Sequence, residues 1–123
     1  MLTTGLKGKA EVKVDDTNTA VTMGSGSLKV FATPAMIALI EKAACAALEG
    51  QLEDGQTTVG TKLDVAHVAA TPVGMNVTAE AVLTEIDNRR LVFEVVARDE
   101  KDIIGKGIHE RFIVNAEKFT AKT

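Results

Sequence analysis

The chain has 123 residues, of which 46% are hydrophobic and 25% are charged, and its net charge is −3. This balance predicts a single folded domain over residues 1–123 and excludes a disordered chain. The chain is acidic and has no Trp or Tyr and only four Phe, so it lacks the basic, aromatic surface that nucleic-acid binding needs.

Compartment and membrane signals are few. No apolar run approaches the roughly 20 residues of a membrane span, and the first residues lack the apolar core of a signal peptide, so we expect no membrane partner. The single cysteine, Cys45, excludes an internal disulfide and favours a reducing, cytoplasmic location. We expect Cys45 to be a small buried residue of a helix rather than a reactive thiol.

In chain order, the first predicted element is a strand over residues 9–14, where small apolar and charged side chains alternate. A polar turn over 15–18 and a short strand over 19–23 follow. The loop 24–27 consists only of Gly and Ser, which favours flexibility. Residues 28–31 are then predicted to run in extended conformation into a helix.

The stretch after residue 31 predicts one long helix. Thr33 offers a hydroxyl that can cap the first turn, and Pro34 suits the first helical position. No breaker follows until Gly50, which suits the left-handed residue just past a helix end. Glu41 lies in register with an apolar face, where an unpaired charge is costly and needs a reason. The residues of that face are Ile37, Ile40, Ala44, Ala47 and Leu48.

The second half of the chain predicts strands only. After a polar connection over 51–56, a strand over 57–69 places His67 on the same face as Val59, Thr61, Leu63 and Val65. Three further strands, joined by short polar turns, predict an antiparallel meander over 75–86, 91–99 and 103–114. One long helix with a sheet large enough to wrap round it gives the α+β class.

A sheet wrapped round one central helix in this order resembles the hotdog fold. Thr33, Glu41 and His67, separated by 8 and 26 positions, resemble the catalytic Thr, Glu and His of the fluoroacetyl-CoA thioesterase family. Gly60, seven residues before the histidine, and Arg111, in the HERF segment of the last strand, also fall where that family has functional residues.

The resemblance covers residues 24–114, most of the chain. It implies hydrolysis of an acyl-CoA thioester by a homodimer whose active sites lie at the subunit interface. CoA would be part of the substrate, with no separate cofactor and no metal. The resemblance leaves open which subunit supplies each site residue, and whether Thr33 is the nucleophile or positions water.

The residue types also suit this chemistry on their own. The imidazole of His67 can take a proton from water or a hydroxyl near neutral pH. Thr33 is predicted at a helix N-terminus, where free N–H groups and the helix dipole favour a developing negative charge. Glu41 can orient the imidazole or hold water, and Arg111 can complement a carboxylate or a phosphate.

Simpler roles stay open for each residue. Thr33 can be no more than a cap, Glu41 an exposed or dimer-contacting carboxylate, and His67 a structural histidine. We take the joint spacing of the set to favour a site. His109 has no matching role and is expected to be structural, and the two histidines are too scattered to suggest a metal site.

Three functions remain open. We favour an acyl-CoA thioesterase over another hotdog acyl-CoA enzyme, such as a hydratase, and over a non-catalytic acyl-CoA-binding module. A hydratase would pair an acid and a histidine in one loop segment, which this chain lacks, whereas a binding module needs only the pocket. The loop Gly24–Ser27 brings only small side chains to the predicted mouth of the site. Such a loop favours no particular acyl group, so the sequence does not support fluoroacetyl specificity. As a family member with its own substrate, the chain is expected to act on a small or short-chain acyl group.

Overall fold

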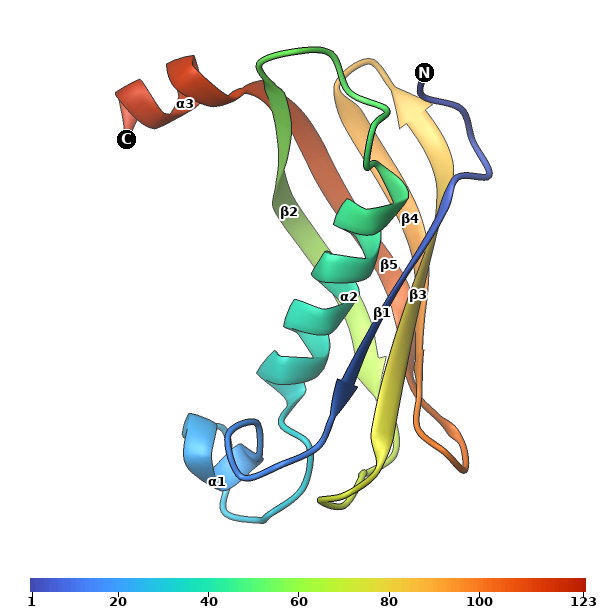
Figure 1. The fold of residues 1–123 in the computed structure, drawn as a ribbon, viewed down its shortest axis with the longest axis vertical. Coiled ribbons are helices and arrows are strands. Elements are labelled where there is room, and N and C mark those ends of the chain that lie inside the picture. The colour runs from blue at the N-terminus through green and yellow to red at the C-terminus, as the bar shows by residue number, and fades with distance from the viewer.

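The computed structural model describes residues 1–123, and one long helix lies across the curled face of a five-stranded antiparallel sheet (Figure 1). The α+β class predicted from the sequence is confirmed. The strands are β1 (Lys7–Lys13), β2 (Gln56–His67), β3 (Asn76–Asp87), β4 (Arg90–Arg98) and β5 (Ile103–Asn115). The helices are α1 (Ala20–Met23), α2 (Thr33–Ala47) and α3 (Ala116–Lys122).

The strand order is β1-β3-β4-β5-β2, and every neighbouring pair is antiparallel. The predicted meander is therefore confirmed as β3-β4-β5. β2 precedes β3 in the chain but pairs with β5, so β1 and β2 form the two edges of the sheet. This order places the end of β2 beside the start of β5, where His67 pairs with Gly105.

α2 packs chiefly on β1 and β3, and its flank toward β2 is less covered (Figure 1). Close approach on the β1 side depends on Gly8, because a Cβ there would overlap the backbone of Ala43 and Ala47. The buried residues of the helix are Met36, Leu39, Ile40, Ala43, Ala44 and Ala47. This face is rotated from the predicted one, so Ile37 is only half-buried and Glu41 lies at the margin of the core.

The ends of α2 differ from the prediction. Thr33 does not cap the helix: Ala32 is the cap residue, Thr33 is the first helical residue, and no side chain makes a capping bond. Pro34 consequently takes the second helical position. At the other end the prediction is confirmed in part: the helix ends at Ala47 with Leu48 as its cap residue, and Gly50, in the turn that follows, has the left-handed conformation expected of it, with φ of 74°.

Three other predictions of local structure were wrong. Residues 19–23 are not a strand, because the Thr19 side chain accepts from the Thr22 N–H and starts the short helix α1. The second half is not only strands, since Asn115 caps α3 by accepting from the Lys118 N–H at 2.9 Å. Cys45 is exposed rather than buried, as the rotated core face of α2 turns it outward.

No helix is both long and apolar enough to cross a membrane.

Candidate active site at the N-terminus of α2

The first residue of the long helix and the last residue of β2 meet at one hydrogen bond. Thr33 Oγ1 lies 2.7 Å from His67 Nδ1. The contact explains why Thr33 does not cap α2, because its hydroxyl is engaged by the imidazole instead. Thr33 is exposed to solvent and His67 is half-buried, so the pair can be reached from outside.

The environment of His67 keeps the imidazole neutral. Burial lowers the pKa of His67, and the nearby backbone of Ala69 only partly opposes that effect. A neutral ring can accept the Thr33 O–H proton at Nδ1, which is how a histidine activates a hydroxyl. The other ring nitrogen, Nε2, is buried and has no hydrogen-bond partner within the chain.

The first turn of α2 supplies backbone donors beside this pair. The first N–H groups of an α-helix have no acceptor within the helix. Pro34 has no N–H, and the Met36 N–H bonds the Ala32 carbonyl at 3.0 Å, which leaves the N–H groups of Thr33 and Ala35. Two such donors at the positive end of a helix dipole can stabilise an oxyanion that forms next to Thr33.

The pair opens into a cavity of about 310 Å³. The loop after α1 contributes Ser25 to its wall, which agrees with the prediction that Gly24–Ser27 lies near the mouth of the site. Six of the nine lining residues are apolar, and Thr33, His67 and Ser25 add polar groups, a combination that can take a short acyl chain with its carbonyl beside the pair. Besides Thr33, His67 and Ser25, the lining residues are Ala20, Val30, Phe31, Val68, Ala69 and Ala70.

The other predicted residues form a second cluster around Arg111, which is buried. Its NH1 group lies 3.3 Å from Glu41 Oε2 and 3.2 Å from His109 Nε2. Its Nε donates to the Thr58 hydroxyl at 2.9 Å, and NH2 donates to the Thr58 carbonyl at 3.1 Å. The carboxylate that Arg111 complements is thus that of Glu41, and four of its five N–H groups are engaged within the chain.

Gly60 makes room for this cluster. A Cβ at position 60 would overlap Glu41 Oε2 and would lie 3.2 Å from Arg111 NH1. The backbone of Gly60 has no positive φ, so its conformation does not require glycine. The glycine is therefore required by the neighbouring ion pair rather than by the strand.

A β-bulge allows both Gly60 and His67 to face α2. Residues seven apart on a regular strand point to opposite faces of the sheet. In β2 the pairing with β5 shifts register between Gly60 and Lys62, and one extra residue restores the common face. The structure thereby corrects the predicted face of β2.

The predicted face of β2 is wrong only for the residues before the bulge. Thr58 and Gly60 face α2 there, whereas Val59 and Thr61 do not share the face of His67. The Thr61 hydroxyl donates instead to the backbone carbonyl of Glu110 at 3.2 Å. Alternation alone could not reveal this change of face; the available signal was Gly60, because an isolated glycine inside a strand often marks a bulge.

The five predicted residues thus form two groups rather than one triad within the chain. Glu41 follows Thr33 by eight residues, which is about 12 Å along an α-helix. Glu41 bonds Arg111, and the only side-chain hydrogen bond of His67 is to Thr33. His109 and Thr58, which complete the Arg111 cluster, were not identified from the sequence. The available signal was the spacing of His109 and Arg111, two residues apart and so on one strand face.

No three His, Cys, Asp or Glu side chains come together in a way that could hold a metal ion. The groups gathered in the two clusters are the hydroxyls of Thr33 and Thr58, the imidazoles of His67 and His109, and the Glu41–Arg111 pair.

Comparison with known proteins gives a consistent result. The family model described as fluoroacetyl-CoA-specific thioesterase matches residues 14–117. The fluoroacetyl-CoA thioesterase of Streptantibioticus cattleyicolor is 46% identical over 94 residues, which span 76% of this chain and 68% of that protein.

Solved structures agree. One of the fluoroacetyl-CoA thioesterase FlK has a TM-score of 0.93 at 36% identity, over 99% of this chain and 95% of that one. A Thermus thermophilus protein described as a thioesterase superfamily member has a TM-score of 0.91 at 26% identity, over 99% and 90% of the two chains. The predicted hotdog fold is confirmed.

Proposed function

The chain belongs to the fluoroacetyl-CoA-specific thioesterase family, and we propose that it hydrolyses a small acyl-CoA thioester to the free acid and CoA. The observation that carries the proposal is the 2.7 Å contact between Thr33 Oγ1 and His67 Nδ1. That contact lies at a helix N-terminus and lines a small apolar cavity. It combines a nucleophile or water-binding hydroxyl, a neutral base and oxyanion donors in one place.

The pair can serve hydrolysis by two routes. In the first, Thr33 Oγ1 attacks the thioester carbonyl as His67 takes its proton, the C–S bond breaks, and the CoA sulfur leaves with the proton from His67. Water then attacks the acyl ester on Thr33 as His67 takes its proton, the ester C–O bond breaks, and His67 returns that proton to Thr33 Oγ1. In the second, the pair holds a water molecule that attacks the thioester carbonyl as His67 takes its proton; the C–S bond then breaks, and the CoA sulfur leaves with the proton from His67. In both, the free N–H groups of Thr33 and Ala35 stabilise the tetrahedral oxyanion.

The acyl group is proposed to be small because of the cavity. Its volume of about 310 Å³ is near the lower end of ligand sites, and Ala20, Ala69 and Ala70 line it without adding polar groups. The S. cattleyicolor relative is described as a fluoroacetyl-CoA thioesterase. For this chain we propose a short acyl group without a specific requirement for fluorine. The loop 24–27 contributes only the small side chain of Ser25 to the cavity, and such a side chain favours no particular acyl group.

We further propose a two-fold homodimer in which Glu41 of one chain serves the Thr33–His67 pair of the other. Within one chain Glu41 lies about 12 Å along the helix from Thr33, too far to join the pair. Glu41 Oε1 makes no hydrogen bond in its own chain, and 38% of the Glu41 side-chain area is exposed, so this carboxylate is free to contact a second chain. The edge strand β2 and the adjacent flank of α2 are uncovered, and Leu63 and Val68 are exposed on this side.

The primary test is steady-state hydrolysis of a panel of acyl-CoA esters, from acetyl and fluoroacetyl to longer chains, with the released thiol detected. We expect turnover with short acyl groups, and at least a tenfold lower kcat for Thr33→Ala and for His67→Ala. Binding of CoA with no turnover on any ester would overturn the proposal and favour the binding module. The hydratase alternative gains no support from the relatives found.

The dimer has its own test. Light scattering at micromolar concentration should give the mass of two chains, and a monomeric mass would contradict the proposal. Thr33→Ala and Glu41→Gln homodimers should each be nearly inactive. After unfolding and refolding the two together, mixed dimers should carry one intact site, which restores about a quarter of the parent's sites. No recovery in mixed dimers of normal mass would mean that Glu41 acts within its own chain.

A further inference from the structure

We propose that His109 is a positioning residue for this hydrolysis, because it fixes Arg111 and through it the carboxylate of Glu41. The inference rests on the proposed function, in which Glu41 belongs to the site. The sequence suggested only a structural role for this histidine. Its two ring nitrogens, however, are both used in a directed chain of hydrogen bonds.

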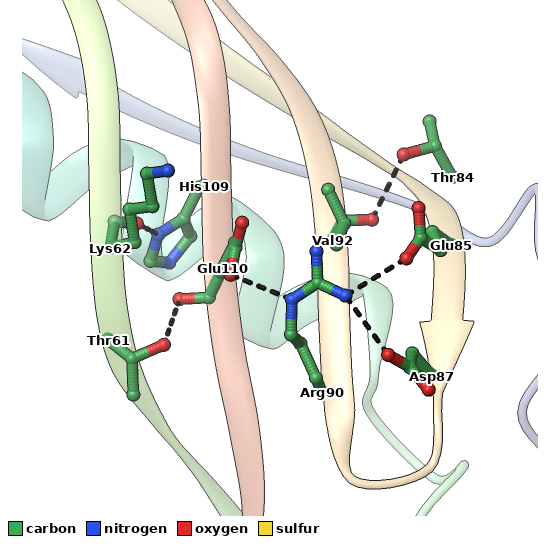
Figure 2. A network of polar contacts seen from close by, with 9 residues as sticks. All are labelled: Thr61, Lys62, Thr84, Glu85, Asp87, Arg90, Val92, His109 and Glu110. Carbon is green, nitrogen blue, oxygen red and sulfur yellow. Dashed lines mark hydrogen bonds and ion pairs between the residues drawn. The ribbon is translucent and has the colours of Figure 1, made fainter.

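The chain begins at the backbone of β2. His109 is fully buried, and its Nδ1 lies 2.8 Å from the carbonyl oxygen of Lys62, a contact drawn in Figure 2. A carbonyl only accepts hydrogen bonds, so Nδ1 must carry the proton. Lys62 directly follows the bulge that sets the face of β2, so the bulge also places the carbonyl that selects this tautomer.

The second ring nitrogen then acts on Arg111. With the proton on Nδ1 of the neutral ring, Nε2 holds a lone pair, and it lies 3.2 Å from Arg111 NH1. A guanidinium only donates, so NH1 gives one of its hydrogens to His109 and the other to Glu41 Oε2 at 3.3 Å. Two bonds to Thr58 hold the far side of the guanidinium. Glu41 is therefore placed by a group that is itself held on both sides.

Removal of the acceptor at position 109 would release this arrangement. A buried N–H of Arg111 would lose its partner, and the guanidinium would have to turn to find another, which would move Glu41. A protonated His109 would present an N–H to an N–H, with the same result. Burial has the largest effect on the pKa of His109 and lowers it, and the Arg111 charge lowers it further. The hydrogen bond to the Lys62 carbonyl and the Glu41 charge raise it, but only in part, so the neutral form is favoured.

Packing is the competing explanation for His109. Its ring stacks on Phe93 at 6.2 Å between centroids, so an apolar residue could fill much of the same space. The next residue, Glu110, lies on the opposite face of the sheet in a separate network with Arg90 (Figure 2). Three variants separate packing from positioning: His109→Leu keeps the volume, His109→Gln keeps a donor and an acceptor, and Phe93→Leu removes the stacked ring alone.

Steady-state kinetics with an acyl-CoA ester that the parent protein hydrolyses give the first readout. His109→Leu should lower kcat by about 10–100-fold with a much smaller change in KM, because a displaced group harms the reaction more than binding. His109→Gln should recover most of that loss. Phe93→Leu should lose stability and keep kcat. Parental kcat in His109→Leu, or an equal loss of kcat in Phe93→Leu, would overturn the proposal. A parent inactive on every ester would instead count against the proposed function.

A spectroscopic readout needs no activity. Nitrogen NMR of the parent at pH 7 should show His109 neutral with its proton on Nδ1. The carboxyl carbon resonance of Glu41 should move in His109→Leu and stay near its parental position in His109→Gln. A proton on Nε2, or a Glu41 resonance unchanged in a folded His109→Leu protein, would overturn the proposal whatever the substrate proves to be.

Discussion

A methyl group added at position 60 tests the second cluster directly. Gly60→Ala leaves the backbone unstrained, but the new Cβ overlaps Glu41 Oε2. The carboxylate is the end of a flexible side chain with 38% of its area exposed, so it can swing into solvent. The strand can therefore remain in place while Glu41 loses its bond to Arg111.

The expected change in stability is small because two effects oppose each other. Loss of a charged hydrogen bond to buried Arg111, reduced by the exposure of Glu41, costs about 1 kcal/mol. Replacing glycine by alanine at a compatible position stabilises by about 0.4–1 kcal/mol, through the unfolded chain. The free energy of unfolding should thus stay within about 1 kcal/mol of the parent, while kcat falls by about tenfold or more as Glu41 is displaced.

A double-mutant cycle with Glu41→Ala makes the test sharp. Urea unfolding and steady-state hydrolysis would be measured for the parent, both single variants and the double variant. Without the Glu41 side chain the overlap is gone and only the 3.2 Å approach to Arg111 NH1 remains, so Gly60→Ala should be less costly to stability in the Glu41→Ala protein than in the parent and should leave its kcat unchanged. Equal effects of Gly60→Ala in the two backgrounds would refute the argument that the glycine is there to admit the carboxylate.

Four other predictions concern the Thr33–His67 pair and acid sensitivity. The Thr33 hydroxyl is not a helix cap, so the loss of unfolding free energy should stay below the cap value of about 1 kcal/mol in each of Thr33→Ser, Thr33→Asn and Thr33→Ala. Only Thr33→Ser should keep substantial kcat. A kcat that follows thermal stability through the series would contradict this. His67→Ala should lower kcat by about 10²–10⁴-fold in a folded protein, and near-parental turnover would return His67 to a structural role. Burial lowers the pKa of both His67 and His109 from 6.5, so activity should persist below pH 6.5 until His67 is protonated, and the pH–rate profile checks this. The two histidines take up protons at a higher pH in the unfolded chain than in the folded one. The free energy of unfolding should therefore begin to fall as the pH drops below about 6.5 and level off below the folded pKa values. A free energy from urea unfolding that is constant across this range would contradict the prediction.

Local sequence patterns determined most of the secondary structure. The long helix and the β3-β4-β5 meander follow from spacing, alternation and turn residues, which act over a few positions. The family resemblance drawn from five spaced residues was confirmed by the comparisons, as was the hotdog fold. The weaker local signals failed where a cap decided the outcome, at Thr19 for α1 and at Asn115 for α3.

The tertiary structure decided how the site residues are grouped. Helical spacing put Glu41 in an apolar face, but packing against β1 and β3 rotated the helix and left this carboxylate at the margin of the core. The hydroxyl of Thr33 had two competing partners, the first turn of its own helix and an imidazole 34 residues away, and the fold gave it to His67. A single bulge in β2 turned both Gly60 and His67 toward α2. Each outcome depends on contacts between segments far apart in the chain, and such contacts leave no periodic pattern in the residues that make them.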